Sequence, residues 1–234
     1  MIDDFTNYKL QISDSPLLLG HRGARKYAPE NTLEAFDLAL QHGCDGFEFD
    51  VRRTCDCRSL ICHDPRLHHH VVAESTFPDL QAAMSTVACL EDVLGRFAGK
   101  AFLDIELKVP QLEDAVLTAL HQRQPCDYVI SSFLSDVLEG VRARDPLAPL
   151  GFIFDQGEAL MRWPSLDVQY VIPQHGLVSR ELVDDVHAAG RKILVWTVNQ
   201  GREMLRLSEW GVDGIISDDT RLLCSTLRGG RDLH

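Results

Sequence analysis

The sequence has no apolar run that approaches the ~20 residues a helix needs to cross a bilayer. Residues 1–16, MIDDFTNYKLQISDSP, contain neither the basic stretch nor the apolar stretch of a secretory signal peptide. We therefore expect no transmembrane segment and a cytoplasmic protein. Hydrophobic residues make up 45% of the chain, which is enough to form the core of a folded domain.

Positive charge is also scarce, because 23 Lys and Arg stand against 35 Asp and Glu, giving a net charge of −12. Nucleic acids and anionic membrane surfaces attract basic patches, so this balance disfavours both as partners. An acidic chain that binds a phosphate ester has to supply positive charge locally, from Arg, Lys or a metal ion.

The seven cysteines are an odd number and are scattered through the apparent core segments. Because the chain shows no export signal, we expect them to be reduced and buried. Cys55, Cys57 and Cys62 beside His63 have the spacing C-x-C-x4-C-H, which matches no structural zinc pattern. Neither a disulfide nor a zinc site is favoured.

Short apolar runs alternate with helix-like amphipathic stretches along most of the chain. The strand-like runs are 17–22, 46–51, 101–107, 128–133, 150–154, 168–173, 192–198 and 214–218. Two of the helix-like stretches end at Gly43 and Gly190, and Ser179 can cap the second. This alternation predicts a closed parallel (β/α)8 barrel, the TIM-barrel fold. An open doubly wound sheet is the alternative, but its usual glycine-rich phosphate loop is absent.

No linker and no break in composition interrupts the chain, so residues 1–234 are predicted to form one domain. The segment 66–89 is too long for a simple βα loop, and we interpret it as a short insertion after the second strand. It contains the run His68-His69-His70, for which a solvated loop is the simplest interpretation.

Two of the strand-like runs carry acids where a strand of a parallel barrel is normally apolar on both faces. In GFEFDV, Glu48 and Asp50 share one face of the strand, and in FLDIELK, Asp104 and Glu106 do the same. The apolar residues of each run must face the helices, so the acids must face the barrel interior or its rim. Buried carboxylates are costly unless they are paired or bind a cation.

These acids have two interpretations. Only Arg52 and Lys108 lie close by in the sequence, which leaves the acids underneutralised, and Mg²⁺ or Ca²⁺ on oxygen ligands is the simplest remedy. A structural network of ion pairs is the alternative. His21 follows the first strand and His63 follows the short run SLIC, so both are expected at strand ends, where barrel enzymes place their catalytic residues. Next to an acidic metal site and Arg22, they are candidates for a general acid–base pair.

The segment 21–64 resembles the signature of the glycerophosphodiester phosphodiesterase family. The shared motifs are HRG, PENT, an acidic pair written E-x-D-V, and a turn that leads to H-D; further along the chain they are ELK at 106–108, SSF at 131–133, VWTVN at 195–199 and GVDGIISDD at 211–219. The resemblance spans nearly the whole chain with the motifs in the right order. One departure is Cys57, which occupies a turn position where the family usually has glycine.

The resemblance implies a TIM barrel that hydrolyses glycerophosphodiesters to glycerol 3-phosphate and an alcohol, with the small diester as its partner. By its motifs, the metal ligands for Mg²⁺ or Ca²⁺ are Glu48, Asp50 and Glu106, and the acid–base pair is His21 and His63. Arg22 and Lys108 are expected to bind the phosphoryl group, and Trp196 to line the substrate pocket or fill the barrel. Glu30 and Asn31 are expected to shape the first loop and cap the helix that begins at Thr32, and Asp218 to be a structural residue at the rim.

Three other functions compete with this one. They are a lysophospholipase D on the same scaffold, a barrel that has become a non-catalytic binding module, and a lyase that uses Lys108 as a Schiff base, although nearby acids would keep that lysine protonated. The sequence leaves open the alcohol headgroup, the metal, the assignment of acid and base, attack by water or by the glycerol 2-hydroxyl, and the oligomeric state.

Overall fold

The computed structural model describes residues 15–229. The predicted absence of a signal peptide concerns residues 1–16, which lie almost entirely outside this range. The eight barrel strands are β1 Leu17–His21, β2 Gly46–Arg53, β6 Phe102–Leu107, β7 Asp127–Ser132, β8 Leu150–Phe154, β9 Tyr170–Pro173, β10 Lys192–Val195 and β11 Gly214–Ser217, counted within the described part of the chain. They pair in parallel, and β1 pairs with both β2 and β11, which closes the sheet. The predicted TIM barrel is confirmed.

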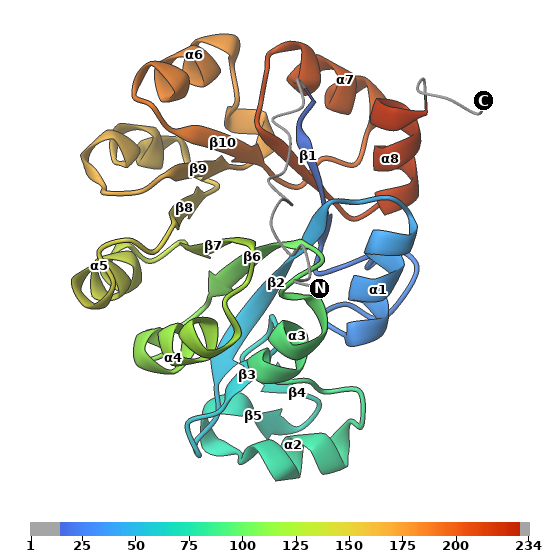
Figure 1. The fold of residues 1–234 in the computed structure, drawn as a ribbon, viewed down its shortest axis with the longest axis vertical. Helices are drawn as coiled ribbons and strands as arrows, with labels where there is room; N and C mark the ends of the chain where they lie inside the picture. The colour runs from blue at the N-terminus through green and yellow to red at the C-terminus, as the bar shows by residue number, and fades with distance from the viewer. Residues whose placement is uncertain (1–14, 230–234) are drawn as a thin grey trace, which may run out of the picture.

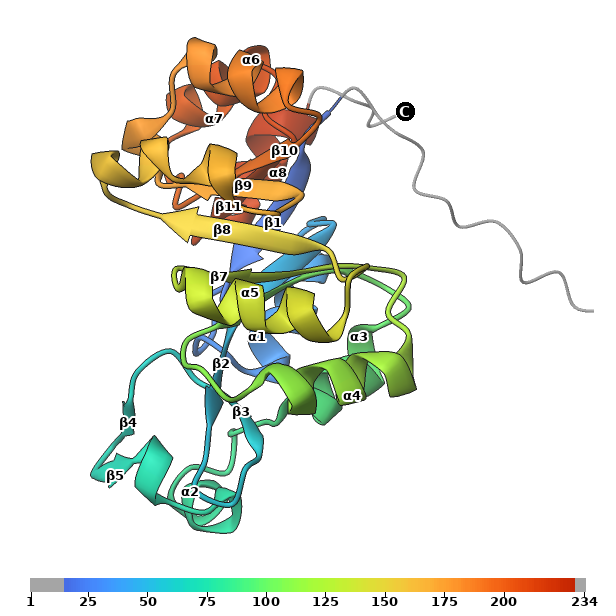
Figure 2. The same ribbon diagram turned by 90° about the vertical axis from the view of Figure 1, so that its left-hand side faces the viewer.

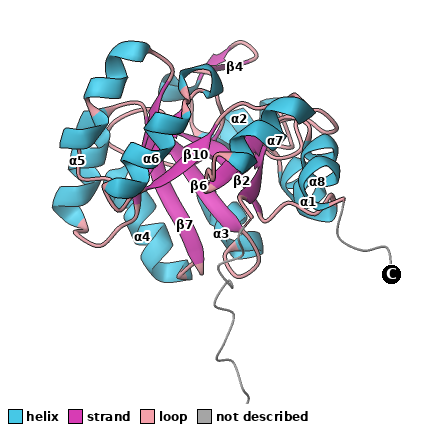
Figure 3. Cartoon of the chain, turned by 90° about the horizontal axis from the view of Figure 1, so that it is seen from above, coloured by secondary structure: helices cyan, strands magenta, loops and turns pink. Residues whose placement is uncertain are grey.

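Helices surround these strands on the outside of the barrel (Figures 1 and 3). They are α1 Leu33–Gln41, α3 Leu90–Phe97, α4 Glu113–Arg123, α5 Ser135–Arg144, α6 Arg180–Ala188, α7 Gly201–Glu209 and α8 Thr220–Arg228. Short 3-10 helices, η2 Gly157–Met161, η3 Trp163–Ser165 and η4 His175–Leu177, follow β8 and β9. Helix α8 was not predicted. It packs beside β1, so the first and last βα units lie next to each other (Figure 1).

The helix ends follow local chemistry. Ser179 caps α6 by accepting a hydrogen bond from the Leu182 amide, as predicted. Gly43, just after α1, has φ 97°, a conformation that favours glycine. The predicted cap of α1 was wrong, because Thr32 itself is the N-cap residue and accepts from the Ala35 amide.

The barrel has an inner and an outer core that follow the alternation of its strands. Phe47, Phe49 and Leu103 belong to the outer core between strands and helices, where the Phe36 ring of α1 stacks on Phe47 at 4.3 Å between centroids. A smaller inner core fills the barrel, with residues such as Val129. The apolar faces of β2 and β6 therefore point to the helices, which leaves their acidic faces for the barrel interior.

The chain leaves the barrel after β2 and returns at α3, and this excursion extends the molecule at one end (Figure 2). It contains β3 Ser59–Ile61, β4 Arg66–Leu67, β5 His70–Val71, η1 Val72–Glu74 and α2 Phe77–Ala83. A small core of its own includes Leu60, Val72 and Leu80. The insertion is thus more structured than a loop. His68 and His69 are exposed at the turn between β4 and β5, where His68 has φ 53°.

The cysteines agree only in part with expectation. All seven are free, but Cys55, Cys57 and Cys126 are exposed, so the prediction that they are buried was wrong for these three. Cys57 adopts φ 62° in the turn that leads to β3, which explains why a glycine suits this position. Within residues 15–229, no helix has the length and apolar character needed to cross a membrane. That residues 1–234 form one domain stays a prediction.

Candidate active site

A cavity of about 240 Å³ opens at the carboxyl ends of the barrel strands, where βα loops meet. Of the eight residues that the sequence singled out, seven line it: His21, Arg22, Glu48, His63, Glu106, Lys108 and Trp196. The eighth, Asp50, is fully buried just beneath, in contact with Arg22 and Lys108. The fold therefore brings all eight predicted residues together. Residues that the sequence did not single out, including Phe133 and Asp155, also line the cavity.

Three acids form a carboxylate cluster, defined here as Glu48, Asp50 and Glu106, with one ligand atom from each lying within 4.8 Å of the others. The register of the sheet explains this, because Asp50 of β2 is paired with Glu106 of β6. Glu48 Oε1 has no hydrogen-bond partner in the described part of the protein. Asp50 Oδ1 likewise has no hydrogen-bond partner among residues 15–229, and the Lys108 ammonium lies 3.3 Å from it.

Burial and mutual repulsion make this cluster costly to ionise. Burial, and then the charges of Asp50 and Glu106, raise the pKa of Glu48 well above its usual value. Burial, and then Asp50, raise the pKa of Glu106 to about 7. Close, buried, incompletely satisfied carboxylate oxygens are the donor set of a hard divalent cation, so these residues fit Mg²⁺ or Ca²⁺. Binding such a cation would release the protons that the acids otherwise retain.

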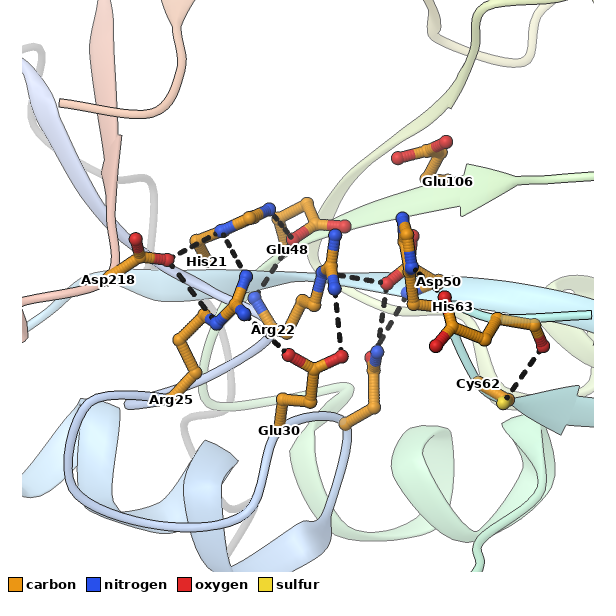
Figure 4. A network of polar contacts seen from close by, with 12 residues as sticks. His21, Arg22, Arg25, Glu30, Glu48, Asp50, Cys62, His63, Glu106 and Asp218 are labelled. Carbon is orange, nitrogen blue, oxygen red and sulfur yellow. Dashed lines mark hydrogen bonds and ion pairs between the residues drawn. The ribbon is translucent and has the colours of Figure 1, made fainter. Parts of the chain in front are cut away.

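Two cations flank the carboxylate cluster and face the cavity. The Arg22 Nε lies 3.2 Å from Asp50 Oδ2, and its Nη1 donates to Glu30. The Lys108 Nζ lies 2.5 Å from Glu106 Oε1. Although burial opposes it, the charges of Lys108 and Arg22 lower the pKa of Asp50. These two groups give the cavity local positive charge, and Figure 4 shows Arg22 beside the acids.

His21 is buried at the end of β1 and is held by Asp218, at the end of β11. The His21 Nδ1 lies 2.7 Å from Asp218 Oδ1. An ionised carboxylate only accepts, so Nδ1 carries the proton and Nε2 is the nitrogen free to act, 3.8 Å from Glu48 Oε2. Burial lowers the pKa of His21 despite this hydrogen bond. Arg25 also approaches Asp218, at 3.5 Å (Figure 4).

His63 reaches the same cavity from the end of β3, the short strand-like run predicted after the second strand. This strand runs antiparallel to the end of β2 and carries the chain back, so that His63 comes close to Asp50 (Figure 4). Its Nδ1 lies 2.8 Å from Asp64 Oδ1, and its carbonyl accepts a hydrogen bond from Arg52 Nε. Asp64 is largely exposed, unlike Asp218.

The contacts that hold several of these residues in place were not predicted from the sequence. Asn31 donates to Asp50 Oδ2 and accepts from the Asp50 amide, so it positions this acid rather than capping a helix. Asn199 donates to Asp218 Oδ2 at 2.6 Å. Trp196 donates its Nε1–H to the Ile172 carbonyl, which fixes the indole against the cavity wall. In the sequence these residues belong to the motifs PENT and VWTVN. A motif, however, gives no information on which groups its residues contact.

Residues 21–222 match the Glycerophosphoryl diester phosphodiesterase family. The chain belongs to this family. Members of this family are phosphoric diester hydrolases, so the chain is an enzyme of that class. The matched residues include every cavity residue named above.

Named relatives agree with this family along nearly the whole chain. The glycerophosphodiester phosphodiesterase of Caldanaerobacter subterraneus is 29% identical over 92% of this chain and 98% of its own length. A phosphodiesterase structure of Oleispira antarctica, in complex with the product sn-glycerol-3-phosphate, is 25% identical, covers 91% of this chain and 96% of its own, and has a TM-score of 0.79. The Thermotoga maritima glycerophosphodiester phosphodiesterase, at 24% identity, shares the fold with a TM-score of 0.81 over 90% and 97% of the two chains.

Proposed function

We propose that the protein hydrolyses glycerophosphodiesters to glycerol 3-phosphate and an alcohol, with a divalent metal ion and two histidines. The observation that carries the proposal is one cavity in which the carboxylate cluster, with unsatisfied oxygens, lies among two histidines and two cations. The product complex of the Oleispira antarctica phosphodiesterase supports the glycerol 3-phosphate half of the substrate.

Glu48, Asp50 and Glu106 would hold the metal ion, Mg²⁺ or Ca²⁺ by the hardness of their oxygens. When bound, such an ion stabilises the charge that develops on the phosphoryl oxygens. Arg22 and Lys108 keep their charge through their contacts with these acids, and they bind the phosphoryl oxygens from the protein side.

The two histidines transfer the protons of the reaction. With Nδ1 bound to an aspartate in each case, His21 and His63 present Nε2 to the cavity. One Nε2 takes the proton of the nucleophile, and the other gives a proton to the leaving alkoxide. Either histidine can serve as base, and either water or the glycerol 2-hydroxyl can serve as nucleophile. The Trp196 ring forms the wall against which the organic part of the substrate packs.

Turnover of a panel of glycerophosphodiesters and lysophospholipids, each with Mg²⁺, Ca²⁺, Mn²⁺ or a chelator, tests this function. We expect turnover of glycerophosphodiesters that stops with the chelator. Turnover of lysophospholipids alone would instead support a lysophospholipase D. Turnover of no diester under any condition would leave a binding module and overturn the proposal.

We predict that Glu48→Gln and His63→Asn each lower kcat by at least about 100-fold, because one loses a metal ligand and the other a proton-transfer group. His69→Asn is the matched control and should retain full activity, because His69 is exposed, lies in the same excursion between β2 and α3 as His63, and does not line the cavity. Circular dichroism and thermal unfolding check that all variants fold. Near-normal kcat in either site variant would refute its role.

A further inference from the structure

The cavity has two chemically different sides. On one side, histidines, acids and cations come from β1, β2, β6 and the loops that follow them. The opposite side, called here the far wall, comes from β7 to β10 and consists of Phe133, Ile153, Asp155, Ile172 and Trp196. Among the described lining residues, Asp155 is the ionisable group of this otherwise apolar wall. Asp155 is exposed to solvent at the mouth, so a ligand that enters the cavity can reach its carboxylate.

Asp155 has no structural role that accounts for it. Within residues 15–229 it makes no hydrogen bond and no ion pair. It precedes η2, but the N-cap position is Gln156 and no side chain caps that helix. It shares the strand face of Ile153, two residues earlier, whose side chain points into the barrel, so Asp155 continues the inward face of β8 up to the mouth.

Asp155 also lies on the side of the cavity toward which one organic group of the diester can project. In the closed order β1-β2-β6-β7-β8-β9-β10-β11, β8 is four strands from β1 in either direction, so it stands across the barrel from Arg22. The phosphodiester is drawn to Arg22 and Lys108 on the near side. Because a diester carries two organic groups, one of them can project across the mouth to the far wall.

Aromatic rings complete this part of the wall. Trp196 meets Phe133 edge to face, at 5.5 Å between centroids. The Lys108 ammonium lies 5.5 Å from the centroid of the Phe133 ring, so this ring already pairs with a cation, and Trp196 is the other aromatic ring of the far wall. Electron-rich rings attract ammonium groups, and quaternary ones above all, so a wall that presents Trp196 and the unpaired Asp155 carboxylate to one cavity suits a cation.

We propose that Asp155 selects diesters whose alcohol carries a positive charge, such as ethanolamine or choline, by facing the ammonium group across the cavity from the phosphate. The inference rests on the proposed function, since it assigns the headgroup of that reaction. Asp155 acts here on substrate choice and has no part in the bond-breaking step.

The test compares kcat/KM of the wild type and Asp155→Asn on three diesters with the same glycerophosphate half. Glycerophosphoethanolamine and glycerophosphocholine are cationic at the headgroup, and glycerophosphoglycerol is neutral there. We expect the variant to lose about three- to tenfold on the two cationic diesters, as for one partly exposed charge pair, and to keep its activity on the neutral one. Raising the salt concentration should reduce the wild-type preference and leave the variant unaffected.

Glu158→Gln is the matched control, because Glu158 is an exposed acid on the same loop that does not line the cavity. It should behave as the wild type on all three diesters. An equal loss on all three with Asp155→Asn would mean that Asp155 contacts the shared glycerol, and no loss would mean that it contacts no substrate. Either result overturns the headgroup assignment. Wild-type protein that hydrolyses none of them would instead refute the proposed function.

Discussion

The two cavity histidines are each paired with an aspartate, but the two pairs differ in their surroundings. Asp218 accepts a hydrogen bond from Asn199 and forms an ion pair with Arg25. Its side chain is 28% exposed, whereas that of Asp64 is 73% exposed. Although burial opposes it, the hydrogen bond from His21 lowers the pKa of Asp218, which keeps this carboxylate ionised. A fixed, ionised acceptor holds His21 in one tautomer and one orientation.

We predict that Asp218→Ala lowers kcat by about 10- to 100-fold, because His21 loses the group that orients it but remains able to transfer a proton. KM should change little, since Asp218 does not line the cavity. Steady-state kinetics give both numbers. Asp64→Ala is the internal comparison and should lower kcat less, because solvent already competes for the hydrogen bond between His63 and the exposed Asp64. A loss confined to KM, or an equal loss in both variants, would contradict this assignment.

At the scale of elements, α8 packs against β1, and an ionised side chain caps its N-terminus. The N-cap residue Asp219 accepts from the Leu222 amide, and also from Lys26 and Tyr27 in the loop after β1. Although burial opposes them, the hydrogen bonds from Lys26 and Tyr27 lower the pKa of Asp219. The last helix is therefore tied to the first βα loop through one carboxylate.

We predict that Asp219→Ala lowers the free energy of unfolding by about 1–2 kcal/mol at neutral pH, the usual cost of a lost cap. The folded pKa lies below the ordinary Asp value of ~3.9, so this stabilisation is present above that pH and is lost as the pH falls through the folded pKa. Urea unfolding at several pH values measures it. Thr32→Ala, which removes the neutral cap of α1, should show a loss that does not depend on pH. An identical pH response of the two variants would argue against the ionic contribution.

At the scale of the whole molecule, the barrel folds around acids that repel one another. Because the folded pKa values of Glu106 and Asp104 are raised to about 7, the contribution of these two acids to metal-free stability is greatest below their ordinary pKa values of ~4 and falls as the pH rises to about 7. A bound cation removes this penalty. Glu48 and Glu106, whose raised pKa values show that their ionisation destabilises the metal-free fold, are also proposed to hold the metal, which is a common relation between stability and function.

We predict that a metal ion at 100 times its Kd stabilises the fold by about 2.7 kcal/mol, which raises Tm by roughly 5–10 °C for a chain of this size. Differential scanning calorimetry with Mg²⁺, Ca²⁺ or a chelator measures the shift. Glu48→Gln should abolish the shift and leave the metal-free protein at least as stable as the wild type at pH 8, because it removes one repelling carboxylate. A metal shift that survives in Glu48→Gln would show that the ion binds elsewhere.

Much of the fold follows from the sequence because its cause is local. A strand that is buried on both faces is apolar throughout, so the charged faces of GFEFDV and FLDIELK were visible as exceptions and showed which residues point inward. All eight barrel strands were predicted from such runs. The insertion was predicted, but its two-residue strands β4 and β5 and its short helix α2 were not, because elements so short have too few residues to show a period.

The sequence by itself determined the eight strands, the inward direction of Glu48, Asp50 and Glu106, and the set of residues that share the cavity, since alternation along a strand and the order of motifs are written in the chain. Only the tertiary structure decided which groups touch. The antiparallel return of β3 places His63, the closure of β1 on β11 joins His21 to Asp218, and the opposition of β8 and β1 sets Asp155 across from Arg22. Those contacts join residues far apart in the chain, and no local period encodes them.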